Sequence, residues 1–193
     1  MENTKTVEIY AEVTPNPNTL KFNVSKTLLS SGSLNYTNKA EAQGAILPQK
    51  LFEIENVIGV MIGPSFVTVT KAPASQWPPL VPQVTQKIKE LLSSEETLFP
   101  GQGQDVGGAE TGHRSGGDSE IEKKIIEILD SEIRPAVAMD GGDITFYGYE
   151  KGVVTLHLQG SCSHCPSSIM TLKMGVENRL RQAIPEIREV VQV

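Results

Sequence analysis

The stretch Gly160-Ser161-Cys162-Ser163-His164-Cys165-Pro166 holds both of the cysteines in a chain of 193 residues. It follows an alternating apolar run, residues 153–158, that predicts a strand, and it precedes a run, residues 166–184, that predicts a helix. Pro166 suits the first turn of that helix, where an N–H has no intrahelical partner. The two thiols are therefore expected at or just before a helix N-terminus, whose positive field favours thiolate over thiol.

A Cys-x-x-Cys pair supports more than one chemistry. Thiolates bind zinc, copper(I) and iron–sulfur clusters, whereas a pair with a lowered thiol pKa exchanges disulfides. In thioredoxin-type domains much of the sheet follows the pair, but here one predicted helix and one short predicted strand follow Cys165. This position favours metal or cluster binding. A thiol–disulfide oxidoreductase stays as the alternative, and a structural zinc module is less favoured because the domain has an apolar core of its own.

The number of thiols limits the kinds of metal site. A zinc site or a [4Fe–4S] cluster needs about four ligands, and the chain offers two thiols. The missing ligands must come from histidine, an exogenous thiol or another chain. A two-fold symmetric dimer would bring Cys162 and Cys165 of two copies around one cluster. Such a cluster would be exposed at the junction and easily given away, so we also expect the pair to be exposed.

Other polar side chains favour structural roles. His164 is expected to point away from a metal that its neighbours bind, and His157 lies on the polar side of an alternating strand. His113 lies in a stretch with nothing nearby to complete a metal site. Asp140 and Asp143 flank two glycines, a pattern typical of a turn in which aspartates bond local N–H groups.

Composition excludes several classes of function. The net charge is -6 and Lys/Arg runs are missing, so phosphate-backbone binding to nucleic acid is not expected. No apolar run approaches the roughly 20 residues of a membrane span. Residues 1–8 have no signal-peptide or transit-peptide character. Two cysteines close in sequence are not a disulfide framework, so a reducing cytoplasm is the expected location.

The chain is expected to form an α+β protein of two small domains. Residues 100–117 are glycine-rich with almost nothing apolar, which predicts a flexible linker. Residues 1–99 form the first predicted domain. Residues 118–193 form the second, in the order helix, strand, strand, helix, strand.

Hydrophobic periodicity sets the predicted elements. In the first domain, hairpins are expected from strands at 6–13 with 20–24 and at 57–61 with 66–70, a short helix at 48–55, and a helix from Pro82 whose buried face is Val81, Val84, Ile88 and Leu91. In the second domain, a helix from Ser119 is expected to stop or kink at Pro135. After it come a hairpin of residues 144–147 and 153–158 with a loop at 148–152, the helix at 166–184 and a strand at 187–193.

Motifs in both halves resemble one known family. In the second half the motifs are Ile133-Arg-Pro-Ala-Val137, Asp140-Gly-Gly-Asp143, Gly152-Val-Val-Thr-Leu156, Gly160-x-Cys-x-x-Cys-Pro-Ser-Ser168 and Thr171-Leu-Lys173. In the first half they include Thr14-Pro-Asn-Pro-Asn-Thr-Leu-Lys-Phe22, Phe66-Val-Thr-Val-Thr-Lys71 and Trp77. On these motifs the second half resembles the C-terminal domain of NifU, the Nfu-type iron–sulfur domain, and the first half resembles the Nfu N-terminal domain.

The resemblance implies a non-enzymatic carrier or scaffold of iron–sulfur clusters. Proteins of this family are similar in binding a labile [4Fe–4S] cluster between two subunits and passing it to apo-proteins. Cys162 and Cys165 match the positions of the cluster ligands. The implied partners are apo iron–sulfur client proteins, cluster-assembly scaffolds and a second copy, which forms a homodimer when the cluster is bound.

Overall fold

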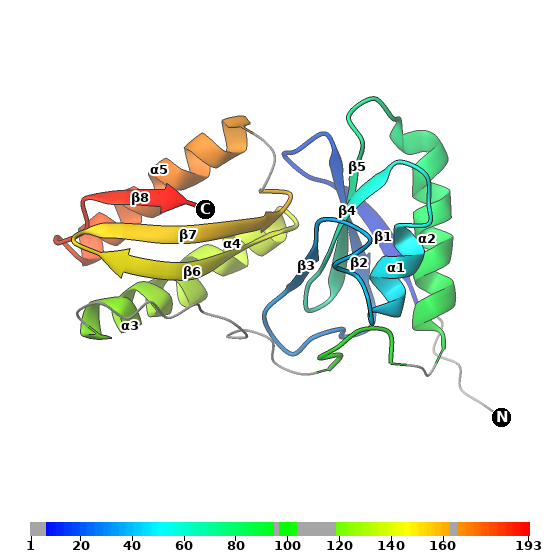
Figure 1. Cartoon of the computed structure of the whole chain (residues 1–193), viewed down its shortest axis with the longest axis horizontal. Helices are drawn as coiled ribbons and strands as arrows, with labels where there is room; N and C mark the ends of the chain where they lie inside the picture. The colour runs from blue at the N-terminus through cyan, green and yellow to red at the C-terminus, as the bar shows by residue number, and fades with distance from the viewer. Residues whose placement is uncertain (1–6, 95–96, 104–118, 163–165) are drawn as a thin grey trace. The chain divides into compact units, whose positions relative to one another are not determined.

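The chain divides into two compact units, Met1–Gly107 and Gly108–Val193. In this computed structural model, residues 7–94, 97–103, 119–162 and 166–193 are described. Each unit has its own sheet and its own apolar core, which confirms the α+β class (Figure 1). Most of the predicted linker lies outside the described residues. Its flexibility, and the bounds 1–99, 100–117 and 118–193, therefore stay predictions.

The N-terminal unit is a five-stranded antiparallel sheet in the order β1-β2-β5-β4-β3, with two helices on one side (Figure 1). Both predicted hairpins are confirmed, because β1 pairs with β2 and β4 with β5. Strand β3 was not predicted, since three residues are too few to show alternation. The elements are β1 (Ile9–Val13), β2 (Thr19–Val24), β3 (Leu34–Tyr36), α1 (Ile46–Leu51), β4 (Val57–Ile62), β5 (Phe66–Lys71) and α2 (Trp77–Leu92).

Helix α2 differs from its prediction in its start and in its buried face. It begins at Trp77, ahead of Pro82, because the prolines that follow Trp77 fit a first turn in which their missing N–H groups have no partner to lose. Val81 and Leu91 are half-buried and flank the row that faces the core. That row has a regular spacing of four residues and consists of Leu80, Val84, Ile88 and Leu92.

The C-terminal unit is a three-stranded sheet in the order β6-β7-β8, with its helices on one face (Figure 1). The predicted order of helix, strand, strand, helix, strand is confirmed. Strand β6 runs antiparallel to β7, and β8 runs parallel to it. The elements are α3 (Ser119–Ile128), the π-helical turn η1 (Leu129–Ile133), α4 (Arg134–Met139), β6 (Gly142–Glu150), β7 (Val153–Gly160), α5 (Pro166–Ala183) and β8 (Glu189–Gln192).

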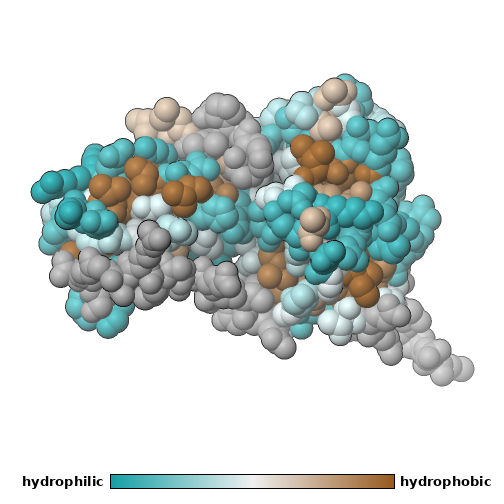
Figure 2. All heavy atoms as spheres, viewed as in Figure 1, coloured by the Kyte–Doolittle hydropathy of each residue, from teal (hydrophilic) through white to brown (hydrophobic). Residues whose placement is uncertain are grey.

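Alternation along β7 sorts side chains between the two faces of this sheet. Leu156 and Leu158 are buried on the helix side, in one core cluster with Val176 and Leu180 of α5. His157 lies between the two leucines and is exposed, as its alternation predicts. On the open face, hydrophobic atoms gather over β8 at the edge of the sheet (Figure 2).

The first helical segment of this unit continues past Pro135. Of the two expected outcomes, a stop or a kink, the stop is wrong, because α3 passes through η1 directly into α4, where Pro135 lies in the first turn. The regular helix is interrupted just before the proline by the π-helical turn η1. In a regular helix a proline ring collides with the carbonyl four residues earlier. The wider π-helical turn provides room for the ring.

The β6–β7 hairpin is longer than predicted. Residues 148–150 belong to β6, so the turn is only Lys151-Gly152, and both residues have positive φ, 50° and 89°. A bulge between Phe146 and Gly148 shifts the register of the ladder. This bulge interrupts the alternation in sequence and conceals the end of the strand.

Candidate functional site

The cysteine stretch starts where β7 ends. Gly160, the last residue of β7, pairs with Gly142, the first residue of β6. Helix α5 begins at Pro166, as predicted. The end of β7 therefore lies at the end of the sheet where α4 leads into β6 (Figure 1), and Cys162 comes two residues after the last residue of β7. His164 and Cys165 lie outside the described residues, so their predicted roles stay predictions.

Cys162 is buried, with 7% of its surface exposed, and belongs to the apolar core cluster of the C-terminal unit. The expectation of an exposed position is wrong for this cysteine. The cause is local, because the chain bends back after β7 at the buried Ser161 and lays Cys162 against the start of β6. A ligand must therefore meet this sulfur at the margin of the core.

Two neighbouring glycines make room for this arrangement in different ways. Gly141 has a φ of 75°, which few residues other than glycine adopt. At Gly142 the constraint is space, because an added Cβ would lie 2.6 Å from Cys162 Sγ and 3.1 Å from the carbonyl oxygen of Gln159. The first glycine permits the turn, and the second permits the sulfur to lie on β6.

Ser161 fastens the cysteine stretch to the turn before β6. Its N–H donates to the carbonyl of Gly141 at 3.2 Å, and its hydroxyl donates to the carbonyl of Asp140 at 2.5 Å. The same hydroxyl oxygen lies 3.8 Å from Cys162 Sγ. The turn and the beginning of the cysteine stretch thus form one hydrogen-bonded unit, although they are far apart in sequence.

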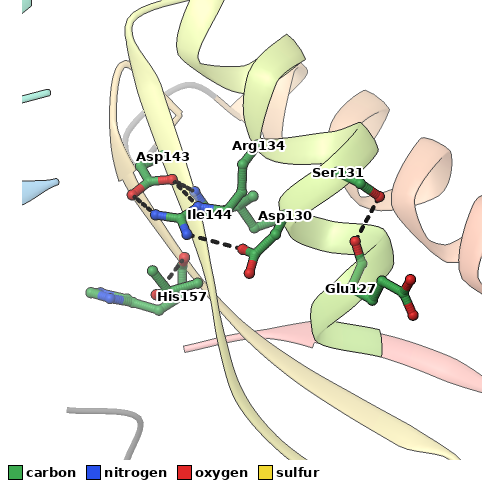
Figure 3. Close-up of polar contacts among 8 residues, drawn as sticks. Glu127, Asp130, Ser131, Arg134, Asp143, Ile144 and His157 are labelled. Atoms are coloured by element: carbon green, nitrogen blue, oxygen red, sulfur yellow. Dashed lines mark hydrogen bonds and ion pairs between the residues drawn. The ribbon is translucent and has the colours of Figure 1, made fainter. Parts of the chain in front are cut away.

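Asp143 joins β6 to the helical segment through Arg134 (Figure 3). Its two carboxylate oxygens accept from Arg134 Nε at 2.9 Å and Nη2 at 3.0 Å, and Oδ1 also accepts the N–H of Ile144 at 2.8 Å. Arg134 Nη1 donates to Asp130 at 3.0 Å. The hydrogen bonds from Arg134 to Asp143 raise the pKa of the guanidinium above its ordinary range, so it stays charged. A bidentate pair of an arginine and a carboxylate is stronger and more specific in its geometry than a hydrogen bond between neutral groups.

Sequence reasoning assigned Asp140 and Asp143 to the turn but missed Arg134 as the partner of Asp143. The sequence carries a signal only for the second partner of Arg134, because Asp130 and Arg134 are four residues apart on a predicted helix. The contact of Arg134 with Asp143 joins a helix to a strand and has no such spacing signal. His157 forms a 3.1 Å contact with Gln159, and its ring points away from Asp143 (Figure 3). Among the described residues, which leave out His164 and Cys165, no three His, Cys, Asp or Glu side chains converge as metal ligands.

Comparison with known families matches both halves of the chain. Residues 9–95 match the family described as "Scaffold protein Nfu/NifU N terminal". Residues 125–191, which include the cysteine stretch, match the family described as "NifU-like domain". The chain therefore has both domain types, in the order that the sequence motifs indicate.

Relatives match along nearly the whole chain. The human protein named "NFU1 iron-sulfur cluster scaffold homolog, mitochondrial" is 41% identical over 186 residues, which is 96% of this chain and 71% of that protein. "NifU-like protein 4, mitochondrial" of Arabidopsis thaliana is 38% identical over 190 residues, 97% of this chain and 66% of that protein. A solved NifU-like protein from Saccharomyces cerevisiae is 26% identical, with a TM-score of 0.46, over 52% of this chain and 90% of its own. The chain belongs to the Nfu family of iron–sulfur cluster scaffold proteins.

Proposed function

We propose that this chain carries a labile [4Fe–4S] cluster between two copies of itself and transfers it to apo-proteins. The observation that carries the proposal is that both cysteines of the chain lie in the stretch that matches the NifU-like domain. Cys162 and Cys165 of each copy are the proposed ligands. The cluster is cargo, so the chain is a carrier and not an enzyme.

The proposed chemistry is ligand exchange. Four thiolates from two copies complete the coordination of the cluster, which needs about four. In transfer, each iron–thiolate bond to the carrier breaks as a bond to a thiolate of the client forms, and no electron moves. The start of α5 at Pro166 supports this chemistry, because the partial positive charge of a helix N-terminus stabilises a nearby thiolate.

Exposed methionines near the cysteine stretch support docking at this end of the unit. Met170 and Met174 lie one turn apart on α5 and are 61% and 59% exposed. Met139, at the end of α4, is 74% exposed. Flexible thioether side chains adapt to more than one partner surface. A carrier needs this property, because it docks on a second copy and then on a client or a cluster-assembly scaffold.

The N-terminal unit is proposed to recognise partners or to restrain the cluster-binding unit. It contains no cysteine and so offers no thiolate to a cluster. Deleting residues 1–99 should therefore leave iron uptake intact and alter transfer to clients. Loss of iron uptake on this deletion would contradict the division of labour.

The direct test is anaerobic reconstitution of the full chain with iron and sulfide. The expected product contains roughly four irons per two chains and shows thiolate-to-iron charge-transfer absorption. Cys162→Ala and Cys165→Ala should both abolish it. His164→Ala is the matched control within the same loop and should retain it. A colourless monomer that cycles between dithiol and disulfide would favour the oxidoreductase, and one zinc per chain would favour a structural zinc module.

A cytoplasmic location is proposed from the sequence and can be tested by cell fractionation. The human and Arabidopsis relatives both carry "mitochondrial" in their names, so a cytoplasmic location for this chain stays a prediction from its sequence. Within the part of the chain that the structure describes, none of the helices has both the length and the apolar character needed to cross a membrane.

A further inference from the structure

We infer that Gly142 and Ser161 are positioning residues that set the place of the Cys162 sulfur, and that the Arg134–Asp143 pair holds both of them in register. The inference rests on the proposed function, in which Cys162 is a cluster ligand. It assigns a purpose to the Asp140-Gly-Gly-Asp143 turn, which ligand chemistry alone leaves unexplained.

Gly142 leaves room for the Cys162 sulfur because it has no side chain. An added Cβ would lie 2.6 Å from Cys162 Sγ, which is closer than non-bonded atoms approach. The backbone of β6 has little freedom to withdraw, because the same Cβ would lie 3.1 Å from the carbonyl oxygen of Gln159 and 3.2 Å from Val137 Cγ1. The sulfur is the end of a short side chain and can rotate about one bond. A methyl group at position 142 is therefore expected to displace the sulfur while the fold persists.

Gly148 provides the internal comparison. It lies on the same strand, β6, yet a Cβ added there would meet nothing within 4 Å. Both glycines weaken the strand to a similar extent, because each lacks a side chain to pack. Only Gly142 is in contact with the cysteine.

Ser161 connects the cysteine stretch to the turn before β6 by hydrogen bonds. Its N–H and hydroxyl both donate to carbonyls of the turn, at Gly141 and Asp140. The residue that precedes Cys162 is thereby tied to the residues that precede Gly142. The sulfur is thus fixed from two sides, by contact with Gly142 and by the hydrogen bonds of its neighbour in sequence.

Arg134 and Asp143 anchor the turn that precedes β6. Asp143 follows Gly142 directly, is 6% exposed, and is held by the two-pronged contact with Arg134. Arg134 opens α4, and α4 ends immediately before the turn. The pair therefore closes a short loop of chain, α4 to turn to β6, and so limits the movement of Gly142 beneath the sulfur.

A fixed sulfur matters for a bridging cluster. Cluster binding by two chains requires each sulfur to be placed before the partner arrives, since a ligand that is already ordered loses less freedom on binding. Residues that contact a metal ligand and fix its orientation typically change the metal affinity by about 10- to 100-fold when they are replaced.

The test uses the full chain with Cys165→Ser, which leaves Cys162 as the one thiol. The rate at which iodoacetamide alkylates the cluster-free protein reports how accessible the Cys162 sulfur is to solvent. Gly142→Ala is expected to raise the alkylation rate by about tenfold or more, as expected when a buried group is released from protection. Gly148→Ala should leave it unchanged. Equal rates for Gly142→Ala in this background and for the chain with Cys165→Ser alone would overturn the inference.

General destabilisation is separated by a core variant at the opposite end of the sheet. Ile187 is buried, and Arg188, the residue after it, donates its N–H to the carbonyl of Gly152 in the turn between β6 and β7. Ile187→Ala should lower the free energy of unfolding without raising the alkylation rate in native conditions. If it accelerates alkylation as much as Gly142→Ala does, the effect is general opening and the inference fails.

The cluster-loaded protein supplies a second readout. In the chain with both cysteines, Gly142→Ala should shorten the lifetime of the cluster by about 10- to 100-fold and shift its charge-transfer absorption. Ser161→Ala should act in the same direction, and Ser161→Thr, which keeps the hydroxyl, should restore the lifetime. Unchanged lifetime and absorption in both variants would overturn the inference. If the unsubstituted chain takes up no iron, the proposed function fails, and alkylation still decides the position of Cys162.

Discussion

The two units of the chain use their buried positions differently. In the N-terminal unit the largest buried side chains, such as Phe22 and Phe99, are apolar and serve packing. In the C-terminal unit the core includes Cys162, and its margin includes the buried carboxylate of Asp143 paired with Arg134. Polar and reactive groups weaken a small core unless they are well paired. Both units bury a charged side chain with a polar partner, Lys71 with Asn18 in the first and Asp143 with Arg134 in the second. The difference between the two units is therefore the thiol, because the second places a candidate ligand, Cys162, in its core.

The chain carries a separate probe for each unit. Its single tryptophan, Trp77, begins α2 of the N-terminal unit, and both cysteines belong to the C-terminal unit. Tryptophan fluorescence therefore follows unfolding of the first unit, and cysteine alkylation follows opening of the second. The following variants use these probes to separate the two units.

The largest effect is expected from Phe22→Ala in the N-terminal unit. Phe22 is fully buried, so truncation should lower the free energy of unfolding of that unit by about 3–5 kcal/mol. The denaturant midpoint of Trp77 fluorescence should fall accordingly. The alkylation rate of Cys162 should stay the same, and a parallel increase would show that the units unfold together.

A smaller effect is expected from Asp143→Asn in the C-terminal unit. The substitution removes a charge-assisted pair at the margin of the core and should lower the free energy of unfolding by about 2 kcal/mol. Circular dichroism should report the shift while the Trp77 transition stays in place. Asp130→Asn is the matched control, because Asp130 binds the same arginine from an exposed position. An equal loss for both variants would contradict a special role for Asp143.

Gly175→Ala is expected to stabilise the C-terminal unit. Gly175 lies within α5, is exposed, and a Cβ added there would meet nothing within 4 Å. Replacing glycine in a helix interior should raise the free energy of unfolding by about 0.5–1 kcal/mol. Thermal unfolding followed by circular dichroism tests this. A loss of stability would mean that this side of α5 is not open to solvent.

The smallest effect is expected from Glu132→Gln. Arg179 donates to Glu132 at 2.6 Å and 2.5 Å, and these hydrogen bonds lower the pKa of the Glu132 carboxyl below its ordinary 4.5. A lowered folded-state pKa adds stability above 4.5, and this stability is lost as the pH falls through the folded-state pKa. The native chain should therefore be slightly more stable than the variant near neutral pH and equally stable in acid. Denaturant midpoints at two pH values test this, and a gap that widens in acid would contradict it.

Much of the fold could be predicted because hydrophobic patterns report burial. The strands that pair β1 with β2 and β4 with β5 showed in the sequence because they alternate or follow strong turn signals. The misses have local causes. The prediction placed Val81 and Leu91 on the buried face of α2, because these half-buried side chains are as apolar as the side chains that do face the core. The bulge at Phe146 and Gly148 concealed the end of β6.

The site was less predictable than the fold. Cys-x-x-Cys spacing and family resemblance indicated the ligands, but spacing does not report burial, so the 7% exposure of Cys162 was missed. That burial depends on Gly142, whose role is to leave space for a sulfur 20 residues later in the sequence. A contact of this kind becomes visible only when β6 and β7 are paired.

Native mass spectrometry of the reconstituted full chain tests the central claim most directly. The account predicts a species with the mass of two chains plus one four-iron cluster. The same species should be missing from Cys162→Ala and retained in Gly148→Ala. A cluster held by a single chain, or a dimer that forms without iron and takes none up, would contradict the proposal that two copies share the cluster through their cysteines.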